Sequence, residues 1–106
     1  MIISTTFEIP GSRVVRVFGL VQGSTVRARH IGRDLTAFLK NITGGEIREY
    51  TKLLAEAREQ CLDRMREEAA RMGANAVIGV RFSSTDISEG ASELLVYGTA
   101  VVLERD

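Results

Sequence analysis

A long apolar stripe at helical spacing constrains the fold of this chain more than any other feature. Between about Gly45 and Met72, apolar residues recur every three or four positions and the residues between them are mostly charged. This period places the apolar side chains on one face of an α-helix, which must be buried against another element. The stripe consists of Tyr50, Leu54, Ala57, Cys61, Met65, Ala69 and Met72. The sequence therefore predicts an amphipathic helix of about seven turns.

The residues that follow the stripe predict how this helix ends. Gly73 comes directly after the last stripe residue and is expected to take a left-handed conformation that closes the helix. The segment "NAVIGVRFS" (75–83) then reads as a strand. A glycine-bearing stretch of this kind could also hold a ligand. We favour a helix end, a cap and a returning strand, because the small residues at 73, 74 and 76 allow a tight reversal.

The remaining segments are mostly strand-like and are separated by turn residues. The expected strands are residues 1–5, 13–22, 25–29, 75–83 and 93–104. A turn "QGST" joins the second strand to the third, and a polar loop at 83–92 precedes the last. Residues 34–42 have the spacing of a short helix, with Asp34 as its N-cap. The order βββααββ predicts one α+β domain over residues 1–106, with a small, mainly antiparallel sheet, one long helix and one short helix.

The last strand is apolar on both of its faces. In residues 94–103, one face carries Leu95, Tyr97, Thr99, Val101 and Leu103, and the other carries Leu94, Val96, Gly98, Ala100 and Val102. A strand of this kind is normally covered on both sides. One long and one short helix cover about one face of a small sheet. A neighbouring subunit would cover the other, although the N-terminal strands could instead curl over and close a barrel-like core.

Composition excludes several classes of partner and location. Fourteen basic residues balance fourteen acidic ones, so no overall field draws the chain to nucleic acid or to a membrane surface. No apolar run approaches the roughly 18–20 residues that span a bilayer, and the first residues do not resemble a signal peptide. A single cysteine suits a reducing compartment. We expect a cytoplasmic protein.

Residues that could carry chemistry are few. Cys61 lies on the apolar stripe and is expected to be buried and inert. His30 is the only histidine, and its neighbours Arg29 and Arg33 disfavour a second positive charge. One thiol and one imidazole cannot form a soft-metal site within one subunit. We therefore predict no catalytic residue, no metal ligand and no cofactor.

Three blocks of the sequence resemble the YbjQ-like family, whose members are also described as putative heavy-metal-binding domains. The blocks are "GRDLTAFLKNITGGEIREYTKLLAEAREQCLDRM", "GANAVIGVRF" and "YGTAVVLE". The resemblance implies a dodecin-like α+β subunit that assembles with itself as a homopentamer and has no established enzymatic activity. Two such rings stacked as a decamer remain an alternative assembly. The family defines no catalytic residues. If the blocks mark a ligand site, its residues would be their polar members, Arg33, Asp34, Tyr50 and Asn75.

Three classes of function remain open at this stage. The first is a homo-oligomeric scaffold or binding protein without catalysis, which we favour. The second is a module that binds a metal or small anion at subunit junctions. The third is an enzyme whose active site lies between subunits.

Overall fold

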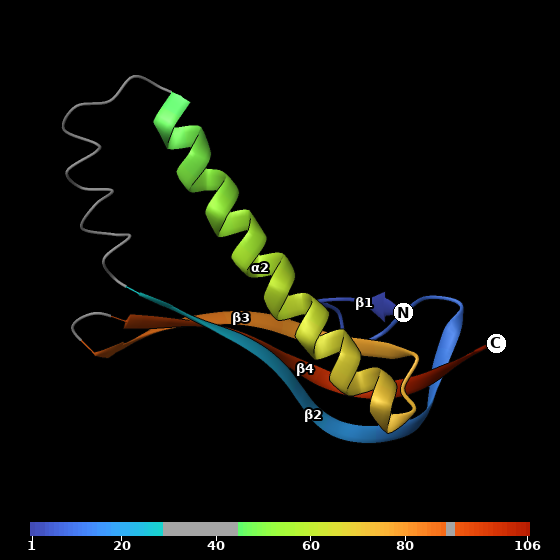
Figure 1. Cartoon of the computed structure of the whole chain (residues 1–106). Helices are drawn as coiled ribbons and strands as arrows, with labels where there is room; N and C mark the ends of the chain where they lie inside the picture. The colour runs from blue at the N-terminus through green and yellow to red at the C-terminus, as the bar shows by residue number, and fades with distance from the viewer. Residues whose placement is uncertain (29–44, 89–90) are drawn as a thin grey trace.

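The computed structural model describes residues 1–28, 45–88 and 91–106 (Figure 1). Within these ranges the chain forms four strands and one long helix, which makes the fold α+β. The elements are β1 (Ile2–Ile3), β2 (Ser12–Ala28), α2 (Gly45–Met72), β3 (Ala76–Ser88) and β4 (Ala91–Arg105). The short helix expected at residues 34–42 lies outside the described residues.

The four strands form one mixed sheet in the order β1-β3-β4-β2. The two long pairings, β2 with β4 and β3 with β4, are antiparallel, whereas the short β1 pairs with β3 in parallel. The expectation of a mainly antiparallel sheet is therefore confirmed for this part of the chain. β1 and β2 lie at opposite edges of the sheet and do not pair with each other, so the described strands form an open sheet instead of the closed barrel that remained an alternative.

The turn predicted at "QGST" was wrong. β2 runs through these residues without interruption, and its register with β4 is regular from Leu20, opposite Thr99, to Ala28, opposite Ala91. Gly23 is needed for another reason, because α2 passes directly over its backbone. A Cβ atom at this position would lie 2.1 Å from the carbonyl oxygen of Cys61. The glycine thus allows close contact between helix and strand and does not reverse the chain.

The polar loop predicted at 83–92 was also wrong over most of its length. β3 continues to Ser88 and β4 begins at Ala91, and the two pair from Ser83 with Leu95 to Asp86 with Ser92. Antiparallel pairing uses backbone groups, so polar side chains do not prevent it. Residues 89 and 90 lie outside the described part of the chain.

The helical stripe is buried over its central part. Ala57, Cys61, Met65 and Ala69 are buried, and three of them contribute to a core with inward-facing residues of β2, β3 and β4. Leu54, nearer the start of α2, is 45% exposed. The N-terminal half of α2 accordingly diverges from the sheet in Figure 1, while the C-terminal half lies against it. The predicted amphipathic helix is therefore confirmed, and among its described side chains the burial of the stripe begins at Ala57.

Gly73 ends α2 as predicted. Its φ angle is +96°, in the left-handed region that glycine takes without a steric cost. The N–H of Gly73 donates to the carbonyl oxygen of Ala70, and that of Ala74 donates to Ala69, each at 3.1 Å. The chain then enters β3 at Ala76. The segment 71–82 is therefore a helix end, a cap and a returning strand.

The contact at Gly23 predicts a large effect of one added methyl group. We expect Gly23→Ala to lower the free energy of unfolding by at least about 2 kcal/mol, because α2 must move away from β2. Gly73→Ala is the comparison, since its added Cβ would meet nothing closer than the Phe18 ring at 3.7 Å. Its cost comes from the positive φ alone, about 1 kcal/mol. Urea denaturation measures the free energy of unfolding of both variants. Equal losses of stability would contradict the close contact between α2 and the backbone at Gly23.

Candidate functional site

The four polar residues predicted as a ligand site are described to different extents. Arg33 and Asp34 lie outside the described residues. Tyr50 lies in α2, but its side chain is outside what the structure describes. Asn75 lies between Gly73 and the start of β3, and its side chain is described. The site can therefore be built only from Asn75 and its surroundings.

Asn75 is held by the backbone of the neighbouring strands. Its Nδ2 donates to the carbonyl oxygen of Leu103 at 2.9 Å, and its Oδ1 accepts from the N–H of Leu103 at 2.7 Å. Its own N–H donates to the carbonyl of Val101, and its carbonyl accepts from the N–H of Ile2. The side-chain amide thus acts as one more strand partner for β4. This arrangement gives Asn75 a structural role, joining the end of α2 to the sheet.

Cys61 is buried, as the sequence predicted. Its side chain is 0% exposed. Its Sγ lies 3.4 Å from the carbonyl oxygen of Leu94 and 3.7 Å from Oγ1 of Thr25. No group of three or more His, Cys, Asp or Glu side chains within the described ranges could hold a metal ion. Cys61 therefore packs as a small apolar residue with a weak S–H donor.

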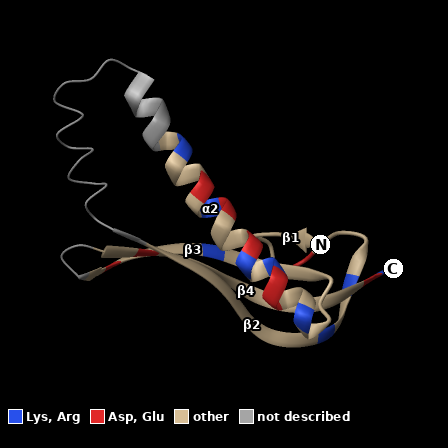
Figure 2. Ribbon diagram, viewed as in Figure 1, with Lys and Arg blue, Asp and Glu red and all other residues tan. Residues whose placement is uncertain are grey.

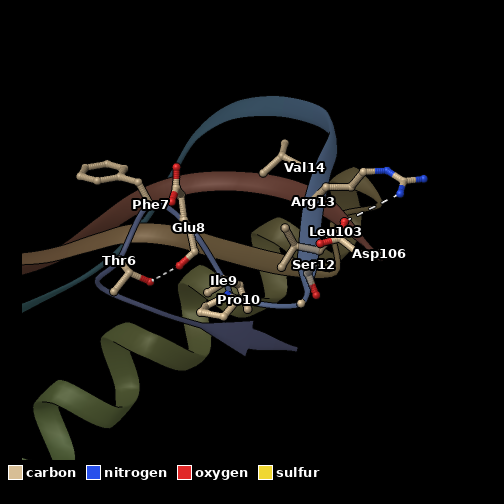
Figure 3. Close-up of a pocket in the computed structure, with 11 residues that line it drawn as sticks. Thr6, Phe7, Glu8, Ile9, Pro10, Ser12, Arg13, Val14, Leu103 and Asp106 are labelled. Carbon is tan, nitrogen blue, oxygen red and sulfur yellow. Dashed lines mark hydrogen bonds and ion pairs between the residues drawn. The ribbon is translucent and has the colours of Figure 1, made fainter.

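A hollow of about 1030 Å³ lies where the N-terminal segment meets the ends of β2 and β4 (Figure 3). Its polar groups are largely engaged within the chain. Oγ1 of Thr6 donates to the carbonyl of Glu8 at 2.8 Å, and the Arg13 guanidinium lies 3.6 Å from a carboxylate oxygen of Glu104 and 3.8 Å from one of Asp106. The lining residues are Thr6, Phe7, Glu8, Ile9, Pro10, Gly11, Ser12, Arg13, Val14, Leu103 and Asp106.

The chemistry of this hollow is limited by its residue types. Among the described residues, its lining contains hydroxyl groups and carboxylates but neither histidine nor cysteine. The ion pairs of Arg13 are mostly exposed and contribute little to stability. The feature of the sequence that lies at this hollow is the stretch "IPGS" (9–12), whose adjacent Pro and Gly have the composition of a turn. That turn exists, with the N–H of Ser12 donating to the carbonyl of Ile9.

Residues of both charge signs are interspersed along the described part of α2 (Figure 2). Arg66 and Asp63, one turn apart, are paired at 2.9 Å. On the sheet, Nη1 of Arg81 donates to the carbonyl oxygens of Thr5 and Val80 and so fastens the N-terminal segment to β3. Among the described residues, no helix is both long enough and apolar enough to cross a membrane. The charge pattern on α2 is that of a solvated helix face.

Comparison with known proteins places this arrangement among a widespread group. A family described as "Putative heavy-metal-binding" matches residues 1–104. A UPF0145 protein of Hahella chejuensis is 58% identical over 104 residues, covering 98% of this chain and all of the relative. A UPF0145 protein of Thermotoga maritima is 52% identical over 105 residues, covering 99% of both chains.

A solved structure shares the fold at low identity. It is a crystal structure of a protein of unknown function from Pediococcus pentosaceus, assigned to the DUF74 family. The two chains superpose with a TM-score of 0.55 and 14% identity, over 100% of this chain and 98% of the other. At this identity the likeness concerns the fold alone.

The hydrogen bonds of Asn75 predict how its replacement acts. Asn75→Ala removes both bonds to Leu103 and should lower the free energy of unfolding by about 1–3 kcal/mol. Asn75→Asp keeps the acceptor but turns a carboxylate towards the carbonyl of Leu103. Once protonated, that carboxyl group can donate to the carbonyl, so its pKa should rise above about 3.9. The deficit of Asn75→Asp relative to the parent should therefore shrink as the pH falls from 7 to 4.

Urea denaturation at both pH values measures these effects. Asn75→Ala is the matched control, because it has no titratable group and its deficit should not depend on pH in this range. A deficit of Asn75→Asp that stayed constant or grew towards pH 4 would contradict the paired bonds to Leu103.

Proposed function

This chain belongs to the YbjQ family, described as "Putative heavy-metal-binding", and from that premise we propose that it acts as a homo-oligomeric scaffold or binding protein without catalysis. No enzymatic activity is established for the family. The observation that carries the proposal is an apolar area on the face of the sheet opposite α2. The burial of individual residues and the strand register define this area.

Strand register separates the two faces of the sheet. Residues directly opposite each other in neighbouring strands point to the same face. Val21 and Thr25 are buried beneath α2, so the alternate residues of β2 point to the other side. Leu20 and Val26 are such residues, and they lie opposite Thr99 and Glu93 of β4. The face away from α2 is the outer face of the sheet.

The outer face carries exposed apolar side chains along β2 and β4. Their exposed fractions lie between 37% and 65%. They are Val14, Val17, Leu20, Val26 and Tyr97, and they form what we call the outer patch. Apolar side chains of this size gain no stabilisation from burial while they are exposed to water. A contiguous apolar area on a soluble protein commonly marks a contact surface.

The N-terminal segment covers only another part of this face. Ile9 packs against Ala76, Ile78, Val101 and Leu103, which are buried. The outer patch lies beside this covered area, towards the β2 edge of the sheet. A second copy of the chain supplies the remaining cover in our proposal, since zero net charge adds no repulsion between identical subunits.

The assembly we propose is a closed ring of five subunits, or two such rings stacked, in the cytoplasm. A contact that repeats head to tail and closes leaves no unsatisfied surface at either end. The subunit number rests on the family resemblance. Each subunit would be one domain over residues 1–106. Ligands, if the assembly binds any, would lie at the junctions between subunits, where residues from two copies meet.

The outer patch predicts a specific effect on assembly. Leu20→Lys places a charge within the patch, and burying an unpaired charge at a contact is strongly unfavourable. We expect this variant to shift the molar mass measured by light scattering from a multiple of 11.6 kDa towards that of one chain. Glu59→Lys is the matched control, since it adds the same side chain on the exposed side of α2. An unchanged molar mass of the Leu20→Lys variant would contradict the proposal that the outer patch is a contact between subunits.

A zinc titration separates the scaffold from a metal-binding module. We expect no saturable heat when zinc ions are titrated into the assembled protein, because the described residues contain no cluster of metal ligands. A saturable heat, lost in the His30→Ala variant, would place the protein in the metal-binding class instead.

A further inference from the structure

The outer edge of β2 has no neighbour among the described strands. β2 is the last strand of the sheet and pairs with β4 along one side only. Two irregularities, at residues 14–16 and 17–19, twist its first half. From Leu20 to Ala28 the register with β4 is regular. The second half of β2 is therefore a long, regular strand edge.

The other side of the sheet offers a second such edge on β3. The N-terminal segment hydrogen-bonds to the first part of β3, where the N–H of Ser4 donates to Val77 and the N–H of Val80 donates to Ser4. Arg81, which donates to the carbonyl of Thr5, marks the end of this cover. From Phe82 to Ser88, no described strand lies beside β3 on this side.

Most of each edge lacks the features by which monomeric proteins protect strand edges, although the register of β3 with β4 shifts once within 82–88, between Asp86 and Ser88. Natural edge strands are commonly interrupted by proline, by lysine or by bulges. Residues 20–28 of β2 contain neither proline nor lysine, and neither do residues 82–88 of β3. Exposed apolar side chains occur on both, including Val26 on β2 and Phe82 and Ile87 on β3. Each edge is thus suited to pair with another strand.

The two edges fit each other in length and direction. β2 and β3 are both antiparallel to β4, so they run the same way. A second copy rotated about an axis roughly along the strands would bring its β3 beside β2 of the first as a parallel pair. Pairing of β2 with β2 would instead leave both β3 edges without a partner. The contact between unlike edges uses both, and it closes into a ring when the rotation from one subunit to the next divides a full turn.

We propose that residues 20–28 of β2 in one subunit pair with residues 82–88 of β3 in the next, so that one sheet continues from subunit to subunit. This inference rests on the proposed homo-oligomer and specifies its contact. Pairing at this edge also brings the neighbouring subunit next to the outer patch, whose members Leu20 and Val26 lie on the same part of β2. The same neighbouring subunit then covers the outer patch and pairs with the strand edge.

A pair of introduced cysteines tests this contact. Ser24 and Ser83 both lie opposite Leu95, on either side of β4. Two strand spacings separate them within one subunit, about 10 Å, and a disulfide does not bridge Cα atoms more than about 7 Å apart. A disulfide between the two positions therefore forms only between subunits. Oxidation of the Ser24→Cys/Ser83→Cys variant should give a ladder of covalent species on a non-reducing gel.

The single variants are the matched controls. Ser24→Cys or Ser83→Cys alone should remain single chains on the gel, because each edge meets the unlike edge of its neighbour. An equimolar mixture of the two, after exchange of subunits, should give covalent dimers. Cys61 is buried and should not contribute, which the parent chain verifies. Dimers formed by Ser24→Cys alone would show pairing of β2 with β2 and overturn the inference.

Light scattering on the same samples distinguishes this inference from the proposed function. A protein that assembles but forms no disulfide between β2 and β3 would overturn the edge contact and leave the homo-oligomer standing. A single-chain mass in the parent would overturn both. Val26→Cys with Thr85→Cys, which both lie opposite Glu93, provides a second pair should the first disturb assembly or miss the register. Absence of a ladder from both pairs in an assembled protein overturns the contact.

Discussion

The close packing of α2 against the backbone of β2 is the contact on which the rest of the structure depends. At Gly23 the strand has no side chain, and the carbonyl oxygen of Cys61 occupies the space that a Cβ would fill. Arg64 of α2 donates to the carbonyl of Ser24 beside it. This contact decides which face of the sheet is buried beneath the helix. Because side chains alternate along a strand, it also decides which residues of β2 and β4 point outward.

Features governed by local rules could be predicted from the sequence, and features governed by distant contacts could not. The helix period and the cap at Gly73 depend on neighbours within a few residues, and both are confirmed. Gly23 looks like a turn residue in "QGST", yet its glycine is required by α2, about forty residues later in the chain. The pairing of 83–88 with β4 could not be predicted, because backbone hydrogen bonds form between strands whether their side chains are polar or apolar.

The candidate site illustrates the same limit. Asn75 is a polar residue in an apolar, glycine-bearing block, which marks it as a candidate, and its amide bonds to Leu103, which lies 28 residues away. Nothing in the spacing of residues indicates that partner. The hollow beside Arg13 cannot be predicted from the sequence, because the Pro10–Gly11 turn has the same signature whether or not it borders a cavity. Arg33, Asp34 and Tyr50 stay predictions, since their side chains lie outside the described part of the chain.

The outer patch and the strand edges depend on each other in energetic terms. Five partly exposed side chains amount to an apolar area of a few hundred square ångströms, whereas a stable contact buries about 800 Å² on each partner. The face of the sheet alone is therefore too small to hold two subunits together. The β2 and β3 edges add backbone hydrogen bonds and the side chains of a second strand, including Phe82 and Ile87. A partner that covered the face without meeting an edge would lack the area for stable association, so in the assembly we propose the second copy engages both.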